Sequence, residues 1–216
     1  MESFALTVDD AVDDPRYIDK LYYLINHKGQ SLGTGQFIKY DDFVDKFNYE
    51  NEFEYIVKEI TRKLWFNKLS WLIKSKTSKQ PAGFEIWINS LPDTSFNNPS
   101  LAGGSGGLNY HLDKDENSST LKLPLFATAL YLGPREGING GELMINVKGL
   151  EHFDSYDGGL IDLNESENWI EIPFKFNRMV VFDAHYPHFV KPVIAFPQGK
   201  KRVCIAINVW DQELSS

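Results

Sequence analysis

The second half of this chain is a succession of short strand-like runs separated by turn signals, and this feature restricts the fold most. The turns contain glycine, asparagine or proline, as in Gly133-Pro134 and Asn139-Gly140-Gly141. Many short strands at this spacing predict an all-β sandwich or barrel. The predicted strands cover residues 84–89, 126–132, 142–147, 169–174, 179–182, 189–195 and 203–210.

The part of the chain before these strands is predicted to be mainly helical. Asp14-Pro15 suits a helix N-cap followed by proline, and apolar residues then recur at helical spacing as far as residues 27–29. A second, longer helical pattern covers residues 50–76. Helices followed by strands indicate an α+β fold. We expect one domain over residues 1–216, with 1–82 as helical support packed on one sheet and 83–216 as the β core.

Composition excludes several classes of function. The formal net charge of -8 argues against non-specific nucleic-acid binding, which requires a basic surface. Cys204 is the only cysteine, so a disulfide framework is excluded and a reducing compartment is expected. No apolar run approaches the ~18 residues of a membrane-spanning helix, and the N-terminus lacks a secretory signal pattern. We therefore expect a cytoplasmic protein without nucleic-acid or membrane partners.

His111-Leu112-Asp113 is the stretch that most directly indicates chemistry. In an extended strand the side chains at positions 111 and 113 share one face. An imidazole and a carboxylate placed in this way are two thirds of a facial 2-His-1-carboxylate metal site, and His188 could supply the third ligand. Arg202 opens a strand-like run and could hold an acidic co-substrate beside the metal.

The order of several short motifs resembles that of the iron(II)/2-oxoglutarate-dependent oxygenases, most closely their prolyl-hydroxylase-like branch. The likeness extends over about residues 109–211, roughly half of the chain. It is carried by His111-x-Asp113, Tyr131, Gly140-Gly141-Glu142-Leu143, Pro187-His188-x-Val190-x-Pro192-Val193 and Arg202.

This resemblance implies a double-stranded β-helix, or jelly roll, with Fe(II) at its mouth. By the match, His111, Asp113 and His188 bind the iron, while Arg202 and Tyr131 bind the distal carboxylate of 2-oxoglutarate. The expected cofactors are Fe(II), 2-oxoglutarate and O₂, with ascorbate as an accessory reductant. Halogenating relatives lose the carboxylate ligand, so its retention favours hydroxylation.

Two assignments have competitors. His185 could replace His188 as the third ligand, although the motif around residue 188 fits the family and continues into a strand. Lys200 and Lys201 compete with Arg202, but both are expected at a solvated hairpin tip.

Three further features leave their roles open. The alternating residues Glu85, Trp87 and Asn89 either line the mouth of the barrel or face water. The acidic residues at 115 and 116 either form a solvated loop or contact a substrate cation. A glycine cluster at 103–107 lacks the lysine of a phosphate-binding loop and is expected to form a lid or a tight backbone approach.

We therefore expect an enzyme that hydroxylates an unactivated carbon of a small metabolite or amino acid and converts 2-oxoglutarate to succinate. The alternative is a peptidyl, prolyl-type hydroxylase. Two other classes compete: a non-catalytic jelly-roll binding module, and a cupin-type metal enzyme in which Arg202 has no role.

Overall fold

The computed structural model describes residues 5–32, 35–44, 51–91, 108–156, 161, 166–195 and 197–215. The helices are α1 (Pro15–Lys28), α2 (Asp41–Val44), α3 (Glu52–Arg62), a π-helical segment (Lys63–Lys68), α4 (Ser70–Lys76), α5 (Leu150–Ser155) and a short 3₁₀ turn (Ser166–Asn168). The strands are β1 (Ala5–Val8), β2 (Gln36–Lys39), β3 (Gly83–Leu91), β4 (Leu108–His111), β5 (Ala127–Gly133), β6 (Asn139–Gly140), β7 (Leu143–Asn146), β8 (Trp169–Ile172), β9 (Met179–Phe182), β10 (His188–Val190), β11 (Val193–Ala195) and β12 (Arg202–Trp210).

Six strands form the larger sheet in the order β1-β9-β5-β12-β3-β2, and all of its pairings are antiparallel. The central strand β12 is buried along its whole length. Because side chains alternate across a strand, β12 presents one row of residues to the helices and the other to the interior. The helix-facing row contains Val203, Ile205, Ile207 and Val209.

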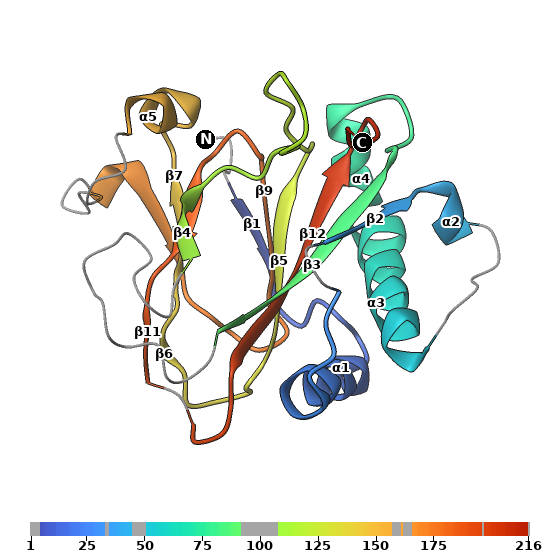
Figure 1. Cartoon of the computed structure of the whole chain (residues 1–216), viewed down its shortest axis with the longest axis vertical. Helices are drawn as coiled ribbons and strands as arrows, with labels where there is room; N and C mark the ends of the chain where they lie inside the picture. The colour runs from blue at the N-terminus through green and yellow to red at the C-terminus, as the bar shows by residue number, and fades with distance from the viewer. Residues whose placement is uncertain are drawn as a thin grey trace.

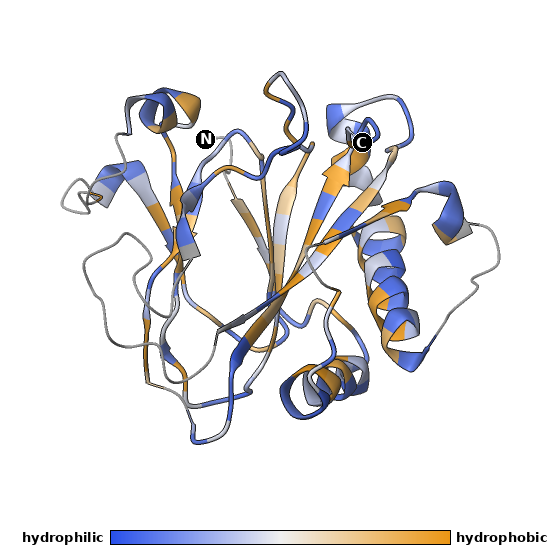
Figure 2. Ribbon diagram, in the orientation of Figure 1, coloured by the Kyte–Doolittle hydropathy of each residue, from blue (hydrophilic) through white to orange (hydrophobic). Residues whose placement is uncertain are grey.

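The helices of the first half of the chain cover one face of the larger sheet, whereas α5 lies near β7 on the side of the smaller sheet (Figure 1). The apolar residues of these first-half helices pack with those of β3, β5, β9 and β12 in one core cluster. Figure 2 shows that α1 and α3 carry both apolar and polar residues along their length, as helices lying between a sheet and solvent do. Asp14 caps α1 by accepting a hydrogen bond from the backbone N–H of Arg16 at 3.1 Å.

The long helical pattern predicted over residues 50–76 is helical but not one continuous α-helix. A π-helical segment separates α3 from α4, and the chain breaks its helical geometry at Leu69. The widened turn buries Leu64 and Trp65 against the larger sheet. Periodicity alone does not distinguish such a bulge from a regular α-helix, since both keep one apolar face.

A second, four-stranded antiparallel sheet has the order β4-β10-β7-β8, and β6 pairs with β11 beside it. The six-stranded and four-stranded sheets share an apolar cluster. It includes Tyr131 and Val180 from the larger sheet and Ile145 and Val190 from the smaller one. The mixed helix-and-antiparallel-sheet architecture agrees with the predicted α+β class.

Two strands lie where only helical support was predicted. β1 and β2 belong to the first 82 residues, yet they form the two edges of the larger sheet. Each is four residues long, too short for a clear alternating pattern. The glycine cluster at 103–107 lies outside the described residues. Among the described helices, none has the length and apolarity needed to cross a membrane.

Candidate metal centre

The two candidate histidine ligands face each other across neighbouring strands of the smaller sheet. His111 ends β4, His188 begins β10, and the two residues are direct partners in the antiparallel pairing. Their ring centroids lie 4.3 Å apart. A sequence separation of 77 residues is thus closed by backbone pairing, which fixes both imidazoles on one rigid sheet.

Asp113 completes the cluster from a position just beyond β4. Its Oδ1 lies 3.5 Å from His111 Nε2 and 4.0 Å from His188 Nε2. One ligand atom from each of the three residues lies within 4.8 Å of the others, a spacing that could hold a metal ion. The sequence pattern predicted this carboxylate on the strand itself. The strand ends instead at residue 111, and the intervening Leu112 is buried.

The protonation states of His188 and Asp113 suit metal binding, whereas His111 must lose a proton to bind a metal. Burial alone would lower the pKa of His111, but its contact with Asp113 outweighs burial and raises it. Burial and the neighbouring His111 lower the pKa of His188 to about 4, so its imidazole is neutral at neutral pH. Burial alone would raise the pKa of Asp113, but attraction to the two imidazoles outweighs burial and lowers it. His111 Nδ1 lies 2.6 Å from the Asn109 carbonyl, and an N–H donated there leaves Nε2 free to face the metal.

A buried arginine, Arg202, lines the same cavity as His111, Asp113 and His188. The Arg202 side chain is 1% exposed, and among the described residues no carboxylate pairs with it. Its guanidinium carbon lies 5.1 Å from the Tyr131 ring centroid and 5.5 Å from that of Phe174. Its Nε and the Tyr131 hydroxyl are both buried without a hydrogen-bond partner. Burial raises the pKa of Tyr131 to about 12, so the hydroxyl remains a donor.

The backbone at Gly141 allows this arginine to lie where it does. Gly141 has a φ of +76°, and a Cβ at this position would lie 2.9 Å from Val193 Cγ2 and 3.0 Å from Arg202 Cδ. Only glycine combines this conformation with the close approach. The Gly-Gly pair noted in the sequence therefore shapes the pocket around the guanidinium.

One cavity between the two sheets joins the histidine–aspartate cluster to the arginine. Trp87 and Asn89 of β3 line it, so this face of β3 points toward the cavity, a point that the sequence left open. Sequence reasoning missed the contribution of Phe174, which stacks on Tyr131 at a centroid distance of 4.9 Å. It also missed Cys204, whose sulfur lies 3.8 Å from Arg202 Nη1. Because side chains two residues apart on a strand share a face, the position of Arg202 could have identified Cys204. No local feature of the sequence indicates that Phe174 approaches Arg202.

His185, the competing ligand, lies outside the cluster. Its Nδ1 lies 2.7 Å from Asp183 Oδ1, and the side chain is largely exposed. Asp183 in turn pairs with Lys76 of α4. His185 therefore belongs to a polar contact between the β9–β10 loop and the helical layer.

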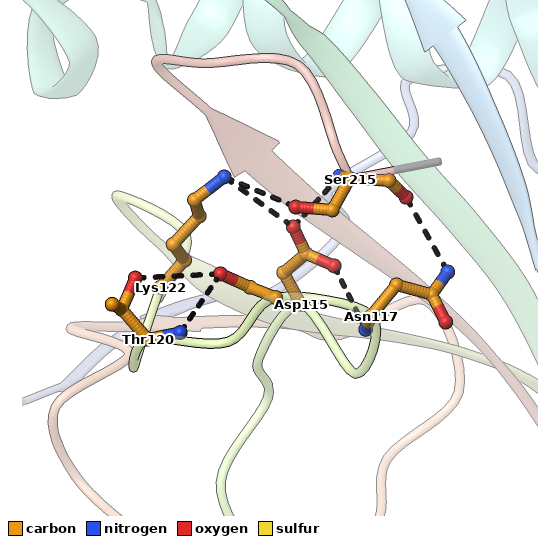
Figure 3. Close-up of polar contacts among 6 residues, drawn as sticks. Asp115, Asn117, Thr120, Lys122 and Ser215 are labelled. Atoms are coloured by element: carbon orange, nitrogen blue, oxygen red, sulfur yellow. Dashed lines mark hydrogen bonds and ion pairs between the residues drawn. The ribbon is translucent and has the colours of Figure 1, made fainter.

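The loop that follows Asp113 is fastened to the C-terminal segment (Figure 3). Asp115 accepts hydrogen bonds from the backbone N–H of Ser215 at 2.8 Å and of Asn117 at 3.1 Å. Lys122 lies 3.9 Å from the same carboxylate. The Glu116 side chain is 74% exposed, and its carboxylate pairs with the Lys114 ammonium at 3.5 Å. The expected solvated loop therefore fits Glu116, whereas Asp115 is buried and bonded within the loop and to the C-terminal segment.

The sequence model of the 2OG-Fe(II) oxygenase superfamily matches residues 98–210. Among curated proteins, none matches this sequence significantly. Solved structures are similar in fold. A prolyl-4-hydroxylase of Pseudomonas putida shares 14% identity at a TM-score of 0.57, covering 98% of this chain and 95% of that one. A 2OG-Fe(II) oxygenase family protein of Burkholderia pseudomallei shares 13% identity at 0.54, covering 99% and 87%. A Trichoplax adhaerens prolyl hydroxylase, solved with a hypoxia inducible factor peptide, shares 12% at 0.53, covering 97% and 84%.

The antiparallel sheets of this α+β fold bring two histidines and an aspartate around one point, an arrangement that could hold a metal ion. Because the family match spans more than half of the chain, the class can be stated more narrowly. The chain belongs to the 2OG-Fe(II) oxygenase superfamily, and the solved structures similar to it in fold include two prolyl hydroxylases. It is an oxygenase whose family uses Fe(II), 2-oxoglutarate and O₂.

Proposed function

We propose that the protein hydroxylates an unactivated carbon of a small metabolite or amino acid while 2-oxoglutarate is converted to succinate. The observation that carries this proposal is the guanidinium of Arg202, which is buried in the same cavity as the histidine–aspartate cluster and has no carboxylate partner in the described part of the chain. An unpaired buried charge is costly, so this site requires an anionic ligand to complete it.

In this proposal His111, Asp113 and His188 hold the iron. Two neutral imidazoles and one carboxylate suit ferrous iron and leave positions for a chelating oxo acid and O₂. Arg202 binds the distal carboxylate of 2-oxoglutarate through its planar fork, and the Tyr131 hydroxyl donates to the same group. The two orphaned buried donors, Arg202 Nε and Tyr131 Oη, support this fit. Around them we propose a double-stranded β-helix, formed by the two facing sheets within a single domain.

Bound Fe(II), 2-oxoglutarate and O₂ supply the oxidising power for replacing C–H by C–OH, with release of CO₂ and succinate. The protein's own residues bind and orient the substrate and the oxo acid, and they exclude water. The aromatic residues Phe174 and Tyr131 enclose the guanidinium, which strengthens its attraction for a carboxylate in a low-dielectric site. Asp113 keeps a carboxylate at the metal, consistent with hydroxylation as the outcome.

Peptidyl, prolyl-type hydroxylation is the second candidate, and the likeness of the fold to prolyl hydroxylases favours it. Assays for succinate release distinguish the two candidates when purified protein, Fe(II), 2-oxoglutarate, O₂ and ascorbate are combined with panels of free amino acids, metabolites and peptides. Stimulation by small molecules supports the first proposal, and stimulation by peptides alone supports the second. Failure of Mn(II)-loaded protein to bind 2-oxoglutarate anaerobically would contradict both.

A further inference from the structure

Strand β3 carries a carboxylate beside the residues that line the metal cavity. Glu85, Trp87 and Asn89 alternate along one face of β3, and the latter two line the cavity. Glu85 is paired across the sheet with Asn208 of β12, in the row of β12 that begins at Arg202. Glu85 therefore lies beside the cavity, next to Trp87 and toward the end of β3 that is away from the register partner of Arg202.

Three other carboxylates are close enough to repel the charge of Glu85, and each is already accounted for. Asp113 belongs to the proposed metal site. Asp115 is bonded to the C-terminal segment and to Lys122, as Figure 3 shows. Glu116 is exposed and pairs with Lys114.

Glu85 differs from these three because no cation pairs with it in the described part of the chain. Its hydrogen-bond partner is the neutral indole of Trp210, whose Nε1 donates to Glu85 Oε2 at 3.1 Å. Burial raises the pKa of Glu85 to about 7, and repulsion from Asp113, Asp115 and Glu116 adds to the effect. A partly buried carboxylate among like charges destabilises a fold, so such residues mark candidate functional positions.

The surroundings of Glu85 resemble a receptor for a cation. Trp87 lies two residues along the same face, about 7 Å away by strand geometry, and is itself only partly buried. An indole face attracts an ammonium or guanidinium group that is stripped of water. Gly35 lies over this pair, since a Cβ there would be 3.8 Å from Glu85 Oε1 and 4.0 Å from Trp87 Cβ. Gly35 itself thus adds no side chain over the carboxylate, and the next residue on this face of the segment is Phe37, the cross-strand partner of Glu85.

We propose that Glu85, with Trp87 beside it, binds a cationic nitrogen of the substrate and thereby selects an amine- or guanidine-bearing molecule. The proposal rests on the proposed function, because it names the substrate class of the same site. The cation can belong to a free basic amino acid or to a lysine or arginine side chain of a peptide. In either case its charge replaces the missing partner of Glu85 and is attracted by the protein's net negative charge.

The test uses pairs of probes that differ mainly in charge. Protein loaded anaerobically with Mn(II) and 2-oxoglutarate is titrated at pH 8 with lysine against norleucine and with arginine against citrulline. The α-N-acetylated amides of lysine and norleucine form the peptidyl arm. We expect one cation to bind at least tenfold more tightly than its neutral partner. Glu85→Gln should remove this preference, whereas Glu116→Gln, which deletes an equal charge from the exposed loop, should change it less than twofold.

The outcomes separate this inference from the proposed function. Equal binding of both members of every pair, no binding of any cation, or a preference that survives in a folded Glu85→Gln variant would each overturn the inference. Thermal melting of the variant establishes that it is folded. Failure of the unmodified protein to bind 2-oxoglutarate would instead refute the proposed function. Normal 2-oxoglutarate binding without charge discrimination would refute the cation site alone.

Discussion

At the level of single residues, the site consists of side chains whose charges are unfavourable until a ligand arrives. Arg202 is a buried cation without an anion, and Glu85 is a partly buried anion without a cation, among the described residues. Arg202 lines the cavity from β12, and Glu85 lies beside the cavity on the paired strand β3, toward the end away from the register partner of Arg202. This separation of charge would orient a substrate and a co-substrate of opposite charge around the metal.

Replacing Arg202 should weaken 2-oxoglutarate binding without loss of the metal. Hydrogen bonds to charged groups contribute about 1.5–3 kcal/mol each, so Arg202→Ala should weaken affinity on the order of 10- to 150-fold. Arg202→Lys should recover only part of it, because lysine lacks the planar fork. Calorimetric titration of Mn(II)-loaded protein measures the effect. Arg135→Ala, at an exposed arginine paired with Asp19, is the control. Unchanged affinity in Arg202→Ala would remove the oxo acid from the proposal.

The two competing histidines can be separated by metal uptake. His188→Ala should abolish stoichiometric Fe(II) or Mn(II) binding, because a buried neutral imidazole is lost from the cluster. His185→Ala should retain the metal, since its ring contacts Asp183 instead. Metal content after anaerobic loading and desalting provides the measurement. The reverse pattern would transfer the ligand role to His185.

Glu85 should make stability depend on pH in a defined direction. Its pKa rises from 4.5 to about 7 in the folded protein, so folding favours the protonated form. The resulting destabilisation is absent below pH 4.5, grows as pH rises, and is complete above about pH 7. Glu85→Gln should therefore raise the melting temperature at pH 8 but scarcely at pH 4.5. If Glu85→Gln and the unmodified protein differed equally in melting temperature at both pH values, the surroundings of Glu85 would not disfavour its ionised form.

At the level of elements, the strands and the position of the site were predictable, but the edges of the sheet were not. Residues 84–89 alternate because one side packs on helices and the other faces the cavity, and residues 203–210 form an almost continuous apolar run because that strand is buried on both faces. The edge strands β1 and β2 gain their pairing from tertiary contacts, which a four-residue pattern cannot reveal. The three candidate ligands could be named from their residue types. That Asp113 lies beyond the strand, or that Phe174 approaches Arg202, depends on packing between distant segments.

The turn that carries Gly141 offers a test at this level. Gly141→Ala combines left-handed backbone strain with a clash against Arg202, so 2-oxoglutarate affinity should fall at least several-fold. Gly29→Ala is a matched control, because Gly29 has a φ of +67° and nothing within 4 Å of an added Cβ. Both variants should lose roughly 1–2 kcal/mol of stability from the strain, but only the first should alter ligand binding. Equal effects on 2-oxoglutarate affinity would show that contact with Arg202 is irrelevant.

At the level of the whole molecule, the proposed ligands connect two sheets that otherwise meet mainly through apolar packing. His111 and His188 belong to the smaller sheet, whereas Arg202 and Tyr131 belong to the larger one. A metal held by the first pair and an oxo acid held by the second would link the sheets across the cavity. Each ligand would stabilise the fold when bound alone, and the link between the sheets would add further stabilisation when both are present.

The resulting prediction is cooperative stabilisation. Ligand at 100 times its dissociation constant stabilises a fold by about 2.7 kcal/mol, which corresponds to roughly 5–10 °C in melting temperature for a chain of this size. Mn(II) and 2-oxoglutarate together, without O₂, should raise the melting temperature by more than the sum of their separate effects. Arg202→Ala should retain the shift caused by Mn(II) and lose the additional one. Strictly additive shifts in the unmodified protein would mean that the two ligands bind independently, and the bridge between the sheets would not exist.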